Sequence, residues 1–121
     1  MKSAIPVIRV SSSIPAKAFY CDKLGFTQAF AYRPDDRRPD PCYMGLFRGG
    51  AFIHVSSFAA NGPTGMSVAF AVEDVDALHS EFVERGVRIH MPPTDQTWGN
   101  REMYVRDPDS NKIAFLQPLG G

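Results

Sequence analysis

The 121-residue sequence has little of several features that would place it in a specialised class of protein. Two cysteines, Cys21 and Cys42, are too few for a disulfide framework, so we expect two reduced thiols in a cytoplasmic protein. Thirteen basic residues balance 13 acidic ones, and nucleic-acid-binding proteins usually carry a basic excess. No apolar run is long enough to span a bilayer, and the N-terminus does not resemble a signal peptide. We therefore expect neither nucleic acid nor membrane as a partner.

The remaining composition is that of an ordinary globular protein. Hydrophobic residues make up 44% of the chain and charged residues 21%. A chain of this length can bury one substantial core but not two independent ones. We therefore treat residues 1–121 as a single domain.

The first half of the chain predicts a strand, a helix, another strand and a hairpin. The helix begins near Ser13 or Ile14, with Pro15 in its first turn, and ends at Gly25, which can adopt the left-handed cap conformation. Pro6 cannot donate to a strand ladder, so it belongs at a sheet edge or where a strand begins. The expected strands cover residues 4–10, 26–32, 43–47 and 51–55, with a polar loop over 33–41.

The second half repeats this order. Residues 66–72 form a strand, Asp74 opens a helix that Gly86 ends, residues 87–90 form a strand, and 91–97 form a proline-containing loop. Two βαβββ modules, about 1–60 and 61–121, fit this repeat. The fold class is therefore α+β, with two curved mixed sheets around a groove.

The only tryptophan of the chain, Trp98, lies just before the last predicted hairpin. After it, Glu102, Tyr104 and Arg106 alternate with apolar residues in the period of a half-buried strand. Residues 107–111 are turn formers, and Ile113, Phe115 and Leu119 are expected on the apolar face of the returning strand. An indole at the lip of a sheet either forms a wall of a ligand pocket or plugs one end of the core.

Five phrases make the chain resemble the vicinal oxygen chelate superfamily, which contains glyoxalases, bleomycin resistance proteins and dioxygenases. They are IPVIRV at 5–10, AFYCDKLGF at 18–26, VEDVDAL at 72–78, WGNRE at 98–102 and RDPDSN at 106–111. The resemblance covers essentially the whole chain. The opening phrase, FIHVS at 52–56, and WGNRE are most similar to the bleomycin resistance group.

The resemblance also implies where a metal site would lie, because enzymes of the superfamily hold a divalent metal with one residue from each of four strands. The matching positions here are Ile5, His54, Ser67 and Ala114, of which only His54 is a good ligand. We therefore expect no metal and no other cofactor, with His54 a neutral, hydrogen-bonded histidine. No phosphate loop or nucleophile elbow is present, and Arg101 and Glu102 point to opposite faces of their strand.

What remains is an aromatic-rich groove. Its candidate walls, most of which we expect to be core, are Phe30, Tyr32, Tyr43, Phe47, Phe58, Trp98 and Tyr104. The predicted ligand-binding residues are Trp98, Phe58, His54, Tyr43, Phe47, Arg101, Glu102 and Tyr104.

The resemblance implies a non-enzymatic, metal-independent homodimer that sequesters a bleomycin-like or other planar aromatic antibiotic and so confers resistance. It further implies exchange of an N-terminal arm marked by Pro6. Because the charges of the 33–41 loop balance, a less cationic ligand, as in the similar mitomycin-binding proteins, is a second expectation. The alternatives are a glyoxalase- or dioxygenase-like metalloenzyme with an atypical site at His54 and Glu102, and a structural homodimer without a ligand.

Overall fold

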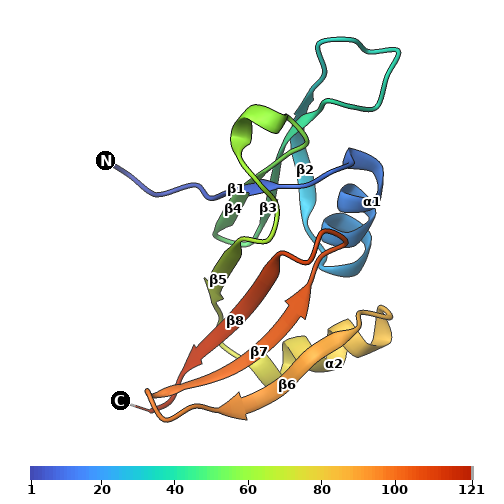
Figure 1. Cartoon of the computed structure of the whole chain (residues 1–121). Coiled ribbons are helices and arrows are strands. Elements are labelled where there is room, and N and C mark those ends of the chain that lie inside the picture. The colour runs from blue at the N-terminus through green and yellow to red at the C-terminus, as the bar shows by residue number, and fades with distance from the viewer. Residues whose placement is uncertain (121) are drawn as a thin grey trace.

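The computed structural model describes residues 1–120, which form two similar halves (Figure 1). No helix in this part of the chain is long and apolar enough to cross a membrane. The elements of the first half are β1 (Val7–Arg9), α1 (Ser13–Lys17), η1 (Ala18–Lys23), β2 (Thr27–Tyr32), β3 (Tyr43–Arg48), β4 (Ala51–Ser56) and η2 (Ala59–Asn61). Those of the second half are β5 (Ser67–Ala71), α2 (Val75–Glu84), β6 (Ile89–Asp95), β7 (Asn100–Arg106) and β8 (Lys112–Pro118).

Each half contributes one four-stranded sheet, and the two sheets have the same strand order. The first sheet runs β1-β4-β3-β2 and the second β5-β8-β7-β6. In each, the first strand pairs in parallel and the other pairs are antiparallel. The predicted α+β class with two βαβββ modules and mixed sheets is confirmed. We call the sheet face that packs on the core and the helices its inner face, and the opposite one its open face.

The two helices begin and end as their sequences predict. Gly25 and Gly86 follow them with φ of +78° and +77°, a backbone conformation that glycine adopts without strain. The side chain of Asp74 caps α2 by accepting from the backbone N–H of Ala77 at 3.0 Å. The first helix changes from α to π geometry at Ala18, which the sequence did not predict.

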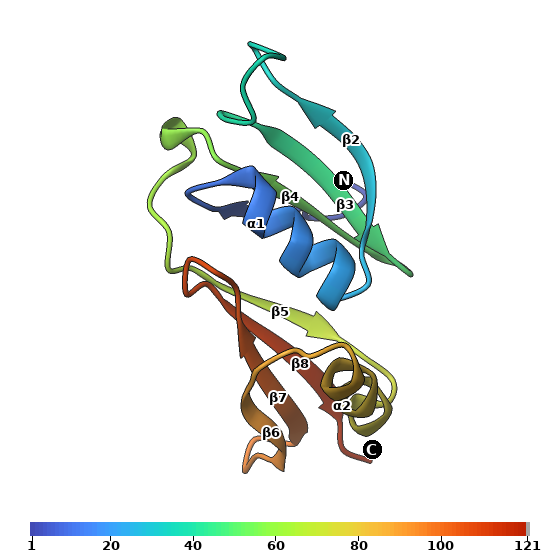
Figure 2. The same ribbon diagram turned by 90° about the vertical axis from the view of Figure 1, so that its right-hand side faces the viewer.

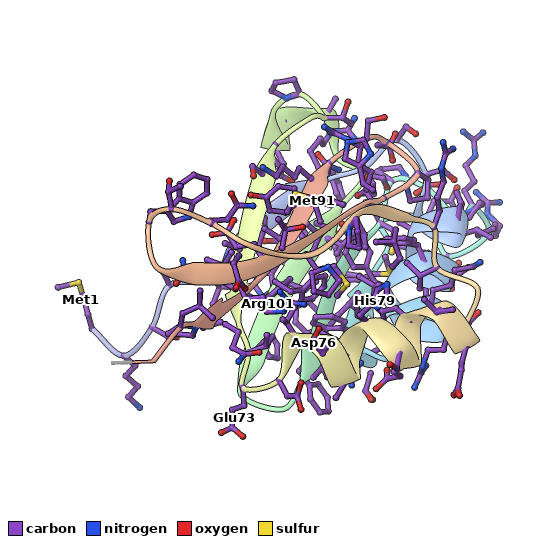
Figure 3. The ribbon with its side chains drawn as sticks, turned by 90° about the horizontal axis from the view of Figure 1, so that it is seen from below. Met1, Glu73, Asp76, His79, Met91 and Arg101 are labelled. Atoms are coloured by element: carbon purple, nitrogen blue, oxygen red, sulfur yellow. The ribbon has the colours of Figure 1, made fainter. Side chains whose placement is uncertain are left out.

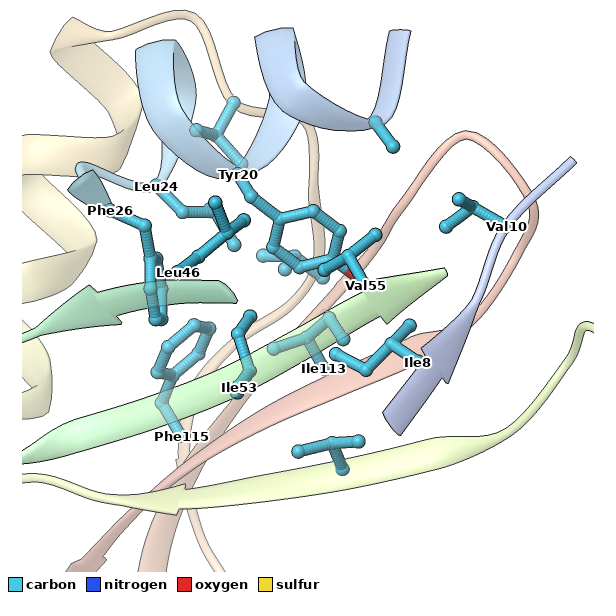
Figure 4. Packing of buried hydrophobic residues seen from close by; sticks show 14 of the residues in the cluster. Ile8, Val10, Tyr20, Leu24, Phe26, Leu46, Ile53, Val55, Ile113 and Phe115 are labelled. Carbon is cyan, nitrogen blue, oxygen red and sulfur yellow. The ribbon is translucent and has the colours of Figure 1, made fainter. Parts of the chain in front are cut away.

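Figure 2 shows the two halves side by side, each with its own sheet and helix, and a single hydrophobic core joins them (Figure 4). Phe26 follows the first helix and lies 5.7 Å, centroid to centroid, from Phe70 on β5, while Phe82 of α2 packs edge-on against Phe115 of β8 at 5.2 Å. Side chains alternate between the two faces along a strand, so every second residue of β3, β4, β7 and β8 points to the inner face and contributes to this core. Cys21 and Cys42 are free thiols, as expected.

The turn between β7 and β8 forms a buried polar connection between the halves. The hydroxyl of Tyr20 donates to Oδ2 of Asp107 at 2.7 Å, and both side chains are buried. Asn111, also buried, donates to that carboxylate and to the carbonyl of Arg9, while its own oxygen accepts from the backbone N–H of Gly65. Burial and the Asp107 carboxylate raise the pKa of Tyr20, so it stays protonated.

Three boundary predictions are wrong. β1 is shorter than the predicted strand over 4–10, because it begins only after Pro6. The predicted loop over 91–97 is mostly strand: β6 extends to Asp95 through Pro92 and Pro93. Prolines are tolerated there because β6 is an edge strand with two register shifts. Leu119 lies beyond the end of β8 and is exposed rather than on the apolar face.

Candidate functional site

The open face of the first sheet is covered with aromatic side chains. Phe30 of β2, Phe47 of β3 and Phe52 of β4 are 42%, 38% and 36% exposed. Phe30 packs across Gly45, where a Cβ atom would lie only 2.1 Å from its ring. Gly45 therefore makes the space in which this ring lies flat on the sheet.

His54 lies at the centre of these rings. Its imidazole contacts Phe30, Tyr43 and Phe52 edge to face, at centroid distances of 5.0–5.6 Å. The Tyr43 hydroxyl and His54 Nδ1 are 2.8 Å apart. Burial lowers the pKa of His54, so the ring is neutral at pH 7, as predicted. When Tyr43 donates to Nδ1, the ring hydrogen is on Nε2, where it can donate to a ligand.

The open face of the second sheet carries one carboxylate, Glu102, surrounded by three hydrogen-bond donors. Glu102 is only 4% exposed. Its carboxylate oxygens accept hydrogen bonds from Trp98 Nε1 at 2.7 Å, Tyr104 OH at 2.5 Å and Asn100 Nδ2 at 3.3 Å. Burial alone would raise the pKa of Glu102, but these hydrogen bonds and the nearby Lys112 lower it. Glu102 is therefore an anion that holds the Trp98 indole in place.

Trp98 does not plug the core. Its side chain is 63% exposed, which leaves the ring face available for a stacking contact. Lys112, on the neighbouring strand, places its ammonium 3.8 Å above the Tyr104 ring. The second open face thus combines one exposed indole with both signs of charge.

Arg101 lies on the other side of the second sheet. Its guanidinium forms ion pairs with Asp76 of α2 at 3.0 Å and with Asp95 at 2.9 Å, as Figure 3 shows for Asp76. The sequence correctly placed Arg101 and Glu102 on opposite faces. The structure does not bring Arg101 together with the other predicted ligand-binding residues.

The other predicted residues fall into two groups, one on each module. Tyr43, Phe47 and His54 share the first open face, and Trp98, Glu102 and Tyr104 share the second. Phe58 follows β4 and stacks on Tyr32 at 6.4 Å. The expectation that most candidate aromatic walls belong to the core is wrong, because none is buried. Period-two alternation predicted that Glu102 and Tyr104 share one face of their strand, but it did not show that this face is uncovered.

The residues do not fit a metal. Among residues 1–120, no three His, Cys, Asp or Glu side chains come together in a metal-binding group. Of the four positions that correspond to family ligands, Ile5 lies before β1 and is 44% exposed, and Ser67 and Ala114 offer no carboxylate or imidazole. His54 already bonds Tyr43 through Nδ1.

A separate cleft of about 840 Å³ lies between the two modules. Its walls include the β3–β4 turn at Gly49 and Gly50, Phe52, and the small residues Ala69 and Ala71 of β5. Arg48 crosses its edge and forms a two-pronged ion pair with Glu81 of α2, with both contacts at 2.8 Å. Small residues on β5 leave the second open face free of bulky side chains next to this cleft.

Comparison with known proteins agrees with this architecture. The model of the Glyoxalase/Bleomycin resistance protein/Dioxygenase superfamily matches residues 5–115. The chain belongs to this superfamily.

Within the superfamily, the chain is similar to drug-binding members. A bleomycin resistance protein from Geobacillus stearothermophilus is 30% identical, with 98% of each chain covered. The crystal structure of TnmS3, an antibiotic binding protein from Streptomyces sp. CB03234, is 27% identical with a TM-score of 0.73, covering 96% of each chain. A bleomycin-binding protein in complex with bleomycin has the same fold, with a TM-score of 0.74 at 20% identity over 97% of this chain and 98% of that one.

Proposed function

We propose that this protein binds and sequesters a planar aromatic compound of the antibiotic kind, without a metal and without chemical conversion. Bleomycin is the first candidate ligand, because the 30% identical relative is a bleomycin resistance protein. Mitomycin is the second, because the charges of the chain balance and provide no excess of acid for a strongly cationic drug.

The observation that carries this proposal is the exposed aromatic surface around His54. Monomeric proteins rarely leave large apolar rings together on one face unless that face binds something. Phe30, Phe47 and Phe52 offer ring faces and edges to a flat ligand, and the Tyr43–His54 pair offers a hydrogen-bond donor that fixes its orientation.

A homodimer completes the site in this proposal. A two-fold dimer can place the first open face of one chain over the second open face of its partner, which makes two equivalent grooves. Each groove then has an aromatic floor on one side and the Trp98–Glu102 wall on the other. The N-terminal segment before β1 extends away from the body of the chain, as an exchanged arm requires (Figure 1).

Calorimetric titration of the protein after dialysis against EDTA tests this proposal. We expect saturable binding of bleomycin or mitomycin at one ligand per chain, unchanged by the chelator, and a dimer in sedimentation at micromolar concentration. His54→Ala should weaken binding, whereas His79→Ala on α2 is the matched control. Binding of neither drug contradicts the proposal. A stoichiometric divalent metal that survives dialysis, or binding that requires one, supports the metalloenzyme alternative instead.

A further inference from the structure

His54 has one free ring nitrogen at the centre of the exposed aromatic surface. Its Nδ1 lies 2.8 Å from the Tyr43 hydroxyl. Its Nε2 has no hydrogen-bond partner among residues 1–120, and it is not one of the nitrogens that the fold closes off from solvent. The imidazole therefore presents one hydrogen-bonding atom that is open to water or to a ligand.

The strand register explains why a flat ligand would meet this nitrogen. Phe30 of β2 pairs with Gly45 of β3, which pairs in turn with His54 of β4. Because Gly45 has no side chain, the Phe30 ring lies over it, 5.5 Å from the imidazole, and the Phe52 ring lies 5.6 Å from the imidazole on the same face. A planar ligand that contacts both phenyl rings would also cover His54.

Covering the imidazole makes its free nitrogen selective. The water that solvates Nε2 is displaced when a ligand ring lies over it, so the ligand has to replace the lost hydrogen bond. A site with a polar atom of this kind rejects analogues that lack the matching group, because its own atom is then left unpaired.

The Tyr43 hydroxyl determines that Nε2 is a donor. A neutral imidazole carries one hydrogen, on Nδ1 or on Nε2. With the hydrogen on Nδ1, the hydroxyl hydrogen of Tyr43 would have no acceptor among residues 1–120. With the hydrogen on Nε2, Tyr43 donates to Nδ1, which is a more basic acceptor than a phenol oxygen. Only the second arrangement satisfies both side chains.

From the free nitrogen and this tautomer, we infer that His54 is a specificity residue whose Nε2–H donates to a carbonyl oxygen of the ligand, and that Tyr43 is its positioning residue. A carbonyl oxygen projects beyond the edge of a ring and carries its lone pairs in the ring plane, so it can reach a donor that lies beside stacked rings. The ligand class is then a planar aromatic compound with a carbonyl group in or next to its ring system.

This inference rests on the proposed function and narrows it. The imidazole is neutral, because burial lowers its pKa, so the contact makes no demand on the charge of the ligand. It distinguishes aromatic compounds that carry a ring carbonyl from those of the same shape and charge that do not.

The test compares two probes by calorimetry at pH 7.5, 2-(aminomethyl)anthraquinone and 2-(aminomethyl)anthracene, which share shape and charge but differ in the ring carbonyls. The wild-type protein should bind the anthraquinone about fivefold more tightly, the ratio expected for one hydrogen bond. His54→Phe keeps an aromatic ring but removes the donor, and it should reduce this preference to less than twofold. His79→Phe on α2 is the matched control and should leave the preference unchanged.

Nitrogen NMR of the wild type measures the tautomer directly. Long-range proton–nitrogen spectra should show His54 with its hydrogen on Nε2, and the anthraquinone should shift the Nε2 resonance more than the anthracene does. Tyr43→Phe should shift the Nδ1 resonance and give a preference between those of the wild type and His54→Phe. An equal loss of affinity for both probes in Tyr43→Phe would overturn its positioning role.

The outcomes separate this inference from the proposed function. Equal binding of both probes to the wild type, a preference that persists in His54→Phe, or a hydrogen on Nδ1 overturns the inference but leaves aromatic binding intact. Binding of neither probe overturns the inference, and if neither bleomycin nor mitomycin binds, the proposed function is overturned as well. Because the NMR measurement needs no variant, the inference remains testable if His54→Phe does not fold.

Discussion

The buried hydrogen bond between Tyr20 and Asp107 predicts a measurable loss of stability when the hydroxyl is removed. Tyr20 is fully buried, and its hydroxyl lies 2.7 Å from a carboxylate oxygen. A hydrogen bond to a charged group contributes about 1.5–3 kcal/mol. Asn111 still donates to the same oxygen at 2.8 Å in the variant, so the carboxylate is not left unpaired. We therefore expect Tyr20→Phe to lower the free energy of unfolding by about 2 kcal/mol.

Thermal and urea unfolding measure this loss. The corresponding decrease in melting temperature is roughly 6–10 °C for a domain of this size. Tyr32→Phe is the matched control, because Tyr32 is 58% exposed, and it should change stability by less than about 0.5 kcal/mol. A Tyr20→Phe variant as stable as the control would show that this bond does not hold the two halves together.

The same bond predicts a pH effect. The pKa of Tyr20 is raised in the folded state, so its contribution is fully present below the ordinary tyrosine pKa of 10.0 and is lost as the pH rises above it. Between pH 10 and 11, the wild type should lose stability more steeply than Tyr20→Phe. Parallel pH profiles of the two proteins would contradict this assignment.

Three further predictions concern the loops and the open faces. Burial would raise the pKa of Asp40, but hydrogen bonds from Ser57, Ser13 and Ser12 lower it. Asp40→Asn should therefore destabilise the protein at pH 7, and this destabilisation should disappear as the pH falls below 3.8. In urea unfolding, a difference in stability between the variant and the wild type that stays constant with pH would refute this prediction. Gly45→Ala should lower the free energy of unfolding by about 1–3 kcal/mol, because the new methyl group displaces the Phe30 ring. In a double-mutant cycle, Phe30→Ala should remove much of this loss, and additive effects of the two substitutions would refute the contact. Trp98 emission should change as Glu102 is protonated below pH 4.5, and a transition that persists in Glu102→Gln would contradict this.

Much of the fold was predictable because capping residues and glycines in the local sequence determine the helix boundaries, and these boundaries recur in both halves. Asp74 and Gly86 bound the second helix as predicted, and Gly25 ends the first. The extent of β6 was not predictable, because Pro92 and Pro93 argue against a strand unless it lies at a sheet edge. Edge position is a property of the assembled sheet and not of the local sequence.

The site was predictable only in part, for a related reason. Alternation correctly placed Glu102 and Tyr104 on one face and Arg101 on the other. It did not show that Tyr43 and Phe47 lie on an uncovered face, because hydrophobic residues suit either a core or a binding surface.

The most direct test of the proposed shared groove mixes two variants that are each expected to bind the ligand weakly. His54→Ala removes the donor of the first open face, and Trp98→Ala removes the exposed indole of the second. If each groove is built from the first face of one chain and the second face of its partner, mixed dimers contain one groove with both faces intact. We predict that neither variant alone binds bleomycin at wild-type affinity, and that calorimetry of the exchanged mixture recovers up to one wild-type site per mixed dimer. No recovery, or wild-type binding by either variant alone, would contradict the shared groove.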